Sequence, residues 1–208
     1  MTSKNVRKGV SYLKRTDPRL ARVIARSKTR PSLSRRNKPF ASLVQSIMYQ
    51  QLAGAAAAAI HKRLLALYDG KEPTPRQVLK THSRTLRYRC GMSWKKAEFL
   101  KDLSRKVLDG TVEIHELDHL PDDKIIEELT QVKGIGRWSA EMFLMFNLGR
   151  LDVFPVDDLG IRNGMTRLYK LRGRVTNERL ERIAERWRPY RSLACWYVWT
   201  YKEGEWKY

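Results

Sequence analysis

A short glycine-containing turn between two helical patterns is the feature that most constrains how this chain can fold. Gly134-Ile135-Gly136 follows a short acidic helical pattern and precedes an apolar one. Glycine permits positive φ angles and close approach of another backbone. Leu129 before the turn and Ala140 after it would supply the apolar contacts of a helix–hairpin–helix unit. The segment is therefore expected to form a tight turn that opens directly into a helix.

Helical patterns cover most of the remaining chain. Asp17-Pro18, Thr74-Pro75 and Ser93 are typical helix starts. Helices are predicted over residues 19–26, 40–49, 55–68, 94–108, 121–130, 137–147, 157–170, 176–187 and 189–201. The alanines from Ala55 to Ala59 are expected to form a tight helix-packing face. With no strand alternation and no internal repeat, the prediction is an all-α fold of two helical lobes with a cleft between them.

The domain expectation is a single domain over residues 1–208. Within it we expect a basic N-terminal segment (1–16), a helical lobe (39–130), a segment with the hairpin and the carboxylates (121–170), and C-terminal helices (176–203). Residues 1–15 are basic and lack the apolar region of a secretion signal. They fit either a nuclear address or a DNA-binding arm.

The charge balance points to nucleic acid. The 208 residues include 42 Lys and Arg against 22 Asp and Glu, a formal net charge of +20. Such an excess suits a phosphate-bearing partner. A membrane partner is not expected, because no run of apolar residues approaches the length of a membrane span. Two cysteines provide neither a disulfide framework nor the four sulfurs of an iron–sulfur cluster.

The turn is a candidate phosphate site. A helix that begins with unbonded backbone N–H groups attracts anions. Lys133 and Arg137 add positive charge on either side of Gly134, Ile135 and Gly136. An ordinary helix–helix turn is the alternative, and the charge excess favours phosphate binding.

Two adjacent carboxylates, Asp157 and Asp158, lie about one helix and loop downstream of the turn. Adjacent residues point in different directions, so they cannot form a facing acid–base pair. Asp157 is predicted to cap the following helix. Asp158 would then lie in the first turn, where the helix dipole favours a negative charge that can stabilise a cationic sugar in glycoside cleavage. The alternative is that both residues only cap the helix.

Five motifs in order resemble the helix–hairpin–helix (HhH-GPD) DNA glycosylase superfamily, in its 3-methyladenine DNA glycosylase II (AlkA-like) branch. They are residues 46–52, 91–97, 134–140, 156–161 and 187–192. The resemblance spans roughly residues 38–203, and the chain is similar to the shorter, two-lobed form of the family.

The resemblance implies several site residues. It places the catalytic aspartate at Asp158 and the minor-groove wedge at Leu52. Trp138 stands where bifunctional relatives carry a Schiff-base lysine, which implies a monofunctional enzyme that uses water. It also implies a monovalent-cation site, for Na⁺ or K⁺, at the backbone carbonyls of Thr130, Val132 and Ile135. No required cofactor, iron–sulfur cluster or zinc is expected.

The base pocket implied by the family is aromatic. Trp138 and Trp199 match its aromatic positions, where electron-rich rings attract a cationic alkylated purine. Core packing is the alternative role for each tryptophan. Met142 stands where the family carries a tyrosine, and Tyr49 is a candidate for the missing ring.

The implied function is excision of alkylated bases of the 3-methyladenine and 7-methylguanine type in base excision repair. The expected partner is damaged double-stranded DNA, bound by a monomer, in a bacterial or archaeal cytoplasm or nucleoid or in a eukaryotic nucleus. The alternatives are a glycosylase for deaminated or oxidised bases and a non-catalytic DNA-binding protein. A zinc protease is a further alternative, because residues 115–119 (His-Glu-Leu-Asp-His) satisfy the H-E-x-x-H pattern.

Overall fold

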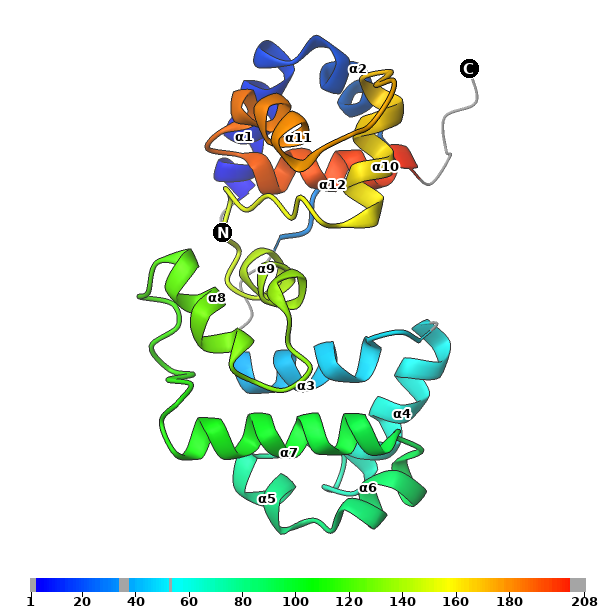
Figure 1. The fold of residues 1–208 in the computed structure, drawn as a ribbon, viewed down its shortest axis with the longest axis vertical. Helices are drawn as coiled ribbons and strands as arrows, with labels where there is room; N and C mark the ends of the chain where they lie inside the picture. The colour runs from blue at the N-terminus through cyan, green and yellow to red at the C-terminus, as the bar shows by residue number, and fades with distance from the viewer. Residues whose placement is uncertain (1–2, 34–37, 53, 203–208) are drawn as a thin grey trace. The chain divides into compact units, whose positions relative to one another are not determined.

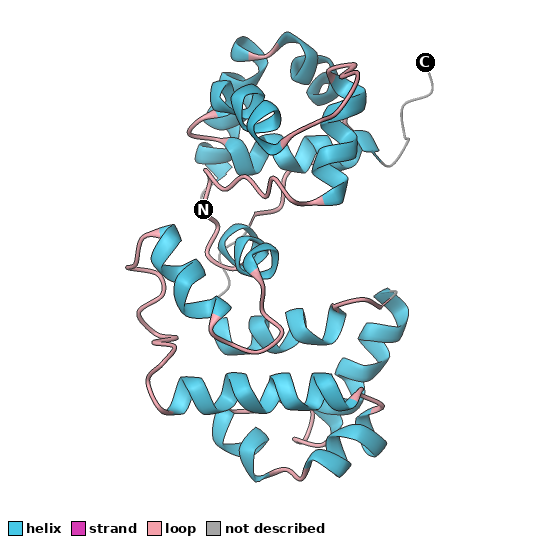
Figure 2. Cartoon of the chain, viewed as in Figure 1, coloured by secondary structure: helices cyan, strands magenta, loops and turns pink. Residues whose placement is uncertain are grey.

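The computed structural model describes residues 3–33, 38–52 and 54–202. These residues form helices joined by loops and turns, with no strand among them (Figure 2). The α-helices are α1 (Ser3–Thr16), α2 (Pro18–Arg26), α3 (Pro39–Tyr49), α4 (Gly54–Ala66), α5 (Pro75–Lys80), α6 (Ser83–Cys90), α7 (Trp94–Leu108), α8 (Asp122–Thr130), α9 (Arg137–Phe146), α10 (Leu159–Leu168), α11 (Asn177–Ala184) and α12 (Arg191–Lys202), with a 3-10 helix, η1 (Glu185–Trp187). The all-α prediction is confirmed. Helices α1 and α6 were not predicted.

The helix starts predicted at Asp17, Thr74 and Ser93 are confirmed in atomic detail. The Asp17 carboxylate accepts the N–H groups of Arg19 and Leu20 at the start of α2. Thr74 forms a reciprocal capping box with Gln77, and Ser93 accepts the N–H of Lys96. Each side chain satisfies an amide that the first turn of a helix leaves without an intrahelical partner.

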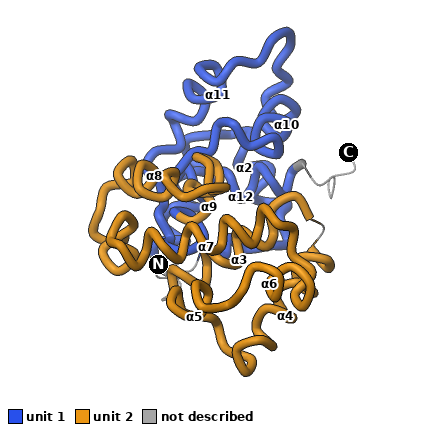
Figure 3. The backbone as a smooth tube through the Cα atoms, turned by 60° about the horizontal axis from the view of Figure 1, so that its bottom comes forward, with its two compact units in different colours: residues 1–35, 144–208 blue, residues 36–143 orange. Residues whose placement is uncertain are grey.

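The chain divides into two compact units (Figure 3). Unit 1 comprises residues 1–35 and 144–208, and unit 2 comprises residues 36–143. This division differs from the predicted segments, because unit 2 runs beyond 130 to include the hairpin and most of α9. The hairpin and Asp158, predicted within one segment, therefore belong to different units. The predicted cleft between lobes stays a prediction.

The N-terminal segment is part of the packed core of unit 1. Helix α1 contacts α2 and α12, and Leu13 is fully buried. Gly9 allows close packing, because a Cβ there would lie 2.4 Å from Leu193 Cδ1. The apolar positions among the basic residues therefore bury one face of a helix, and a nuclear address or a DNA contact in this segment stays a prediction.

A buried carboxylate joins three distant parts of unit 1. Asp17 is 1% exposed and receives the Trp187 indole N–H at 2.9 Å and the Tyr169 hydroxyl in addition to its capping bonds. Burial and the Asp17 charge raise the pKa of Tyr169, so its hydroxyl stays a donor. A buried charge is tolerated only when it is surrounded by hydrogen-bond donors.

Unit 2 is organised around α7, which packs against α3, α5 and α6 (Figure 1). Its buried face includes Ala97, Leu100 and Leu103. The prediction that the alanines from Ala55 to Ala59 form a tight helix-packing face is wrong. Within it only Ala57 is buried, because the run lies in the first turns of α4 with its other alanines facing outward. Among the described residues, no helix combines the length and apolar character needed to cross a bilayer.

Replacing Asp17 by alanine should lower the free energy of unfolding by about 3 kcal/mol, since it removes a helix cap and leaves buried donors without an acceptor. Urea unfolding followed by circular dichroism measures the change. Asp123→Ala, at an exposed position in the first turn of α8, is the control and should cost less than about 1 kcal/mol. Equal effects of the two substitutions would contradict the account.

Candidate active site and nucleic-acid interface

Asp158 begins α10. Its Oδ1 accepts the backbone N–H of Ile161 at 2.8 Å, so Asp158 is the N-cap. The prediction that Asp157 caps this helix is wrong. The Asp158 N–H donates to the Pro155 carbonyl and closes a turn. Because of this turn, the helix begins one residue later than predicted. The carboxylate that caps α10 thus faces the positive end of the helix dipole.

The same oxygen is bound by an indole. Trp199 of α12 donates its Nε1–H to Asp158 Oδ1 at 2.8 Å. Helices α10 and α12 approach closely through Gly160 and Gly164: a Cβ at Gly160 would lie 2.8 Å from Trp199 Cδ1, and one at Gly164 would lie 2.6 Å from Val198 Cγ1. Two donors from two elements therefore fix one carboxylate oxygen.

Asp157 has a different partner. Its Oδ1 accepts the Asn177 side-chain amide at 2.8 Å, at the start of α11. Arg162 of α10 bonds the Asn177 side-chain oxygen and donates to the carbonyls of Val175, at 2.8 Å, and Val156, at 3.4 Å. This network ties the loop that carries both aspartates to α10 and α11.

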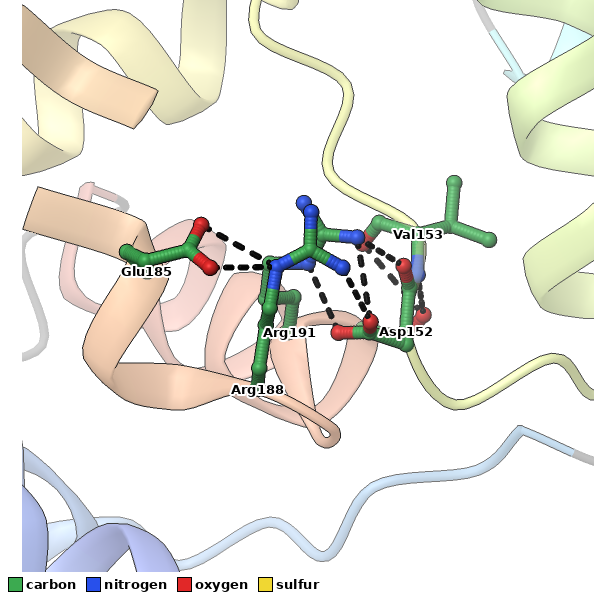
Figure 4. Close-up of polar contacts among 6 residues, drawn as sticks. Asp152, Val153, Glu185, Arg188 and Arg191 are labelled. Carbon is green, nitrogen blue, oxygen red and sulfur yellow. Dashed lines mark hydrogen bonds and ion pairs between the residues drawn. The ribbon is translucent and has the colours of Figure 1, made fainter. Parts of the chain in front are cut away.

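A second set of ion pairs holds the same loop further upstream (Figure 4). The Asp152 carboxylate accepts from Arg191 Nε at 2.7 Å and from Arg188 NH1 at 2.9 Å, and Arg188 also pairs with Glu185. The Ser192 hydroxyl accepts the N–H of Val153 at 2.9 Å. Residues 187–192, noted in the sequence as a family motif, thus anchor the loop before Asp158 to the start of α12.

In unit 2 the hairpin rests on α7. Asp102, which is 5% exposed, accepts the Lys133 backbone N–H at 2.9 Å. Burial alone would raise the pKa of Asp102, but the bond from Lys133 and the Lys106 ammonium hold it below the usual range. Gly134 has a φ of +80° and lies directly over Phe99, so a Cβ there would be 2.1 Å from the ring.

The charged side chains of the hairpin have acidic neighbours. Lys133 Nζ lies 2.6 Å from Glu98, which raises the pKa of Lys133, and Arg137 Nε lies 3.1 Å from Glu141. Both cations remain mostly exposed. The amides of Gly134 and Gly136 are exposed and, within the described residues, bond no other group. These amides, together with the first turn of α9, are the groups best placed to receive an anion.

The predicted wedge residue is on the surface. Leu52 is 40% exposed, so its side chain does not belong to the core of unit 2. Gln51 before it has a φ of +55°, a strained conformation for a non-glycine residue that is often found at functional sites. The Gln50 side-chain amide donates to the Gly134 carbonyl at 2.8 Å, and Lys96 donates to the Gln50 carbonyl at 2.9 Å. A hydrogen bond therefore joins the wedge segment (residues 50–52) directly to the hairpin.

The residues predicted for the base pocket are divided between the units. Trp138, 45% exposed, Tyr49, 38% exposed, and the half-buried Met142 belong to unit 2. Trp199 belongs to unit 1, where its ring lies 5.9 Å from that of Phe146. Core packing is not the role of Trp138. Trp199 donates its indole N–H to Asp158, a residue 41 positions away, so no local sequence pattern could predict this bond. Its role in the base pocket stays a prediction.

The cation site that the resemblance implies stays a prediction. Thr130 is the last residue of α8, and Val132 and Ile135 follow in the turn, where the Val132 carbonyl accepts the Ile135 N–H at 3.0 Å. Residues 115–119 form turns and not the helix that the H-E-x-x-H pattern requires, so the zinc-protease alternative is wrong. No group of three or more candidate metal ligands is found among the described residues.

Sequence reasoning missed the supporting residues. In unit 1 these residues are Gly160, Arg162 and Asn177, which support Asp158 and its loop. In unit 2 they are Lys96, Phe99 and Asp102, which support the wedge segment and the hairpin. The spacing of Gly160 and Gly164 on one helix face was the available signal, since two small residues one turn apart indicate a close helix contact.

Comparison with known proteins identifies the family of this chain. The model of the HhH-GPD superfamily of base excision DNA repair proteins matches residues 44–189. DNA-3-methyladenine glycosylase 1 of Schizosaccharomyces pombe is 35% identical over 183 residues, which cover 87% of this chain and 79% of that protein. DNA-3-methyladenine glycosylase 2 of Escherichia coli is 32% identical, and the match covers 77% of this chain and 56% of that protein.

A solved structure of the DNA-3-methyladenine glycosidase of Bacillus halodurans matches with a TM-score of 0.84 and 36% identity, covering 94% of this chain and 89% of that one. The S. pombe 3-methyladenine DNA glycosylase in complex with abasic DNA matches with a TM-score of 0.78 and 35% identity, covering 93% and 95%. The chain belongs to the HhH-GPD superfamily of base excision DNA repair proteins, in its 3-methyladenine DNA glycosylase branch.

Gly134→Ala should destabilise the protein by about 2–4 kcal/mol, because the added methyl group both meets the Phe99 ring and occupies a positive-φ residue. Chemical denaturation measures the loss. Gly136→Ala is the matched control: no atom lies within 4 Å of its Cβ position, so its effect should stay within about 1 kcal/mol. Equal costs at both positions would show that Phe99 does not limit the turn.

Proposed function

We propose that this protein is a monofunctional DNA glycosylase that releases alkylated bases, of the 3-methyladenine and 7-methylguanine type, from double-stranded DNA and leaves an abasic site. The observation that carries the proposal is the Asp158 carboxylate, held by Trp199 and by the start of α10 in a chain of the 3-methyladenine DNA glycosylase branch. No feature of the site favours either alternative, a glycosylase for deaminated or oxidised bases or a non-catalytic DNA-binding protein.

In the proposed mechanism, Asp158 stabilises positive charge on the sugar. Cleavage of an N-glycosidic bond in DNA builds up oxocarbenium character at the deoxyribose ring, and a fixed carboxylate lowers the energy of that state. The bonds from Ile161 and Trp199 orient the carboxylate before the substrate arrives, so little reorganisation is needed. Asp157, bound to Asn177, keeps the loop in place and does not take part in the chemistry.

Water is the proposed nucleophile. The position that carries a Schiff-base lysine in lyase relatives is Trp138 here, and an indole has no amine that could attack the sugar carbon. The exposed Trp138 ring offers its face to an alkylated purine instead. Such a base is cationic, and a cation over an aromatic face is stabilised by about 0.5–2 kcal/mol. Tyr49 and the apolar Met142 are the further candidates for contacts with the base.

The hairpin is the proposed phosphate site, through the amides of Gly134 and Gly136 and the charges of Lys133 and Arg137. Leu52 would enter the minor groove and fill the space left by the extruded nucleotide. A monovalent cation held by the carbonyls of Thr130, Val132 and Ile135 would add positive charge beside that phosphate. The protein is proposed to act as a monomer.

Asp158→Asn should reduce base release from methylated duplex DNA by about 100-fold or more, since the charge is lost. Asparagine keeps the cap, because it is as good an N-cap as aspartate. Chromatography of released bases under single-turnover conditions measures the rate. Asp157→Asn is the matched control and should retain most of the activity. Full base release by Asp158→Asn would refute the assignment.

Trp199→Phe should slow base release by about tenfold or more, because a hydrogen bond to a charged group contributes roughly 1.5–3 kcal/mol. DNA affinity should change little, which separates positioning of Asp158 from DNA binding. Trp196→Phe is the control on the same helix, since within the described residues its Nε1 has no hydrogen-bond partner. If both variants lose activity equally, the indole–carboxylate bond is not the cause.

A further inference from the structure

The first two helices of unit 1 and the residues after them carry a dense array of positive charge. All nine Lys and Arg side chains of residues 5–33 are exposed: Arg7, Lys8, Lys14, Arg15, Arg19, Arg22, Arg26, Lys28 and Arg30. The acidic residue of this stretch, Asp17, is 1% exposed and is bound inside unit 1. Among the described residues none of the nine cations forms an ion pair. This surface therefore has no carboxylates of its own to balance its charge.

On α1 the cations lie in two parallel rows. Arg7 and Lys14 are seven residues apart, as are Lys8 and Arg15, and seven residues are close to two helical turns. The members of a row therefore lie about 10 Å apart along the helix axis. Leu13 on the opposite face is fully buried, so all four cations share the outer face of α1.

Helix α2 extends this surface. Arg19, Arg22 and Arg26 are exposed, whereas its other face is buried through Leu20, Val23 and Ile24. Helices α1 and α2, blue in Figure 1, pack against each other and against α12. Because the core of unit 1 holds both helices, the backbone that carries the cations is ordered before a partner arrives, which reduces the entropic cost of binding.

The cations of α2 lie at the far end of α10 from the candidate catalytic residue. Arg19 NH1 donates to the Tyr169 carbonyl at 2.6 Å, and its guanidinium lies 5.5 Å from the centroid of the Tyr169 ring. Tyr169 ends α10 and Asp158 begins it. The ten residues of α10 span about 15 Å. A DNA segment that reaches Asp158 therefore meets one end of α10, and the cations begin at the other.

Duplex DNA fits this surface better than a membrane does. A helix that lies on a membrane needs exposed apolar side chains beside its cations. None of the exposed large apolar side chains of the described residues belongs to α1 or α2. A duplex carries about one negative charge per 1.7 Å of its axis, so an ordered array of cations can contact several phosphates at once.

We propose that the exposed cations of α1 and α2 bind a second DNA duplex while the first duplex occupies the site of Asp158. We call this surface the basic helix pair (residues 7–26). One protein molecule would then bridge two DNA segments, which allows it to pass from one segment to the other without dissociating into solution. The inference rests on the proposed function only in that the first duplex is bound at the Asp158 site.

The test mixes two undamaged duplexes, one with a donor dye and one with an acceptor dye, and measures energy transfer after the protein is added. The wild type should bring the dyes together, and analytical ultracentrifugation should show one protein with two duplexes. The neutralised variant carries Arg7→Gln, Lys14→Gln, Arg15→Gln and Arg22→Gln, at exposed helix positions that glutamine suits about equally well. It should bind the second duplex about tenfold more weakly or worse, because it loses up to four phosphate contacts.

The matched control removes four exposed arginines around α11, a region that also contains Glu178, Glu181 and Glu185. It carries Arg172→Gln, Arg174→Gln, Arg182→Gln and Arg186→Gln and should bridge as the wild type does. Equal melting temperatures would show that both variants are folded. As a measurement that needs no variant, bridging by the wild type should be lost as salt rises from about 50 to 200 mM.

Three results would overturn the inference: equal energy transfer in the neutralised variant and the wild type, an equal loss in the control, or complexes of one protein with one duplex or two proteins with two duplexes. Binding to phosphatidylserine vesicles that needs the same four cations, without bridging of DNA, would assign the surface to a membrane and also overturn it. Base release at saturating methylated DNA should be equal in the neutralised variant and the wild type. Its absence from the wild type would refute the proposed function and leave the bridging result standing.

Discussion

One carboxylate oxygen is the point on which the proposed chemistry depends. Asp158 Oδ1 receives a backbone N–H from its own helix and an indole N–H from α12. The indole bond requires α10 and α12 to lie close together, which Gly160 and Gly164 permit. The loop that delivers Asp158 is fixed twice more, through Asp157 by Asn177 and through Asp152 by two arginines. These hydrogen bonds and ion pairs of unit 1 together position the Asp158 side chain.

Unit 2 has a comparable construction around α7. Its residues support the wedge segment (residues 50–52) and the hairpin: Lys96 bonds the Gln50 carbonyl, Phe99 packs under Gly134 and Asp102 bonds the Lys133 N–H. A single helix therefore supports both the wedge segment and the hairpin. Burial lowers the pKa of Lys96, and its two carbonyl acceptors compensate for the desolvation of the ammonium.

Much of the fold could be predicted because helix starts are encoded locally. Capping side chains, with a proline in the first turn of α2 and of α5, predicted the starts of α2, α5 and α7 to within a residue. The errors arose where tertiary contacts decide. Asp158, and not Asp157, is the cap because the preceding turn contains one more residue. Helix α1 was not predicted, because its packing depends on Gly9 meeting Leu193, a residue far along the chain. The Trp199–Asp158 bond joins residues 41 positions apart, which no local pattern encodes.

The central claim is that the indole of Trp199 holds Asp158. Nuclear magnetic resonance of the tryptophan indole N–H groups tests it most directly, in the wild type and in Asp158→Ala. The account predicts that the Trp199 indole proton exchanges slowly with solvent, and that the substitution moves its resonance and speeds its exchange, while the Trp196 resonance changes little. A Trp199 resonance that is unaffected by loss of the carboxylate would contradict the claim.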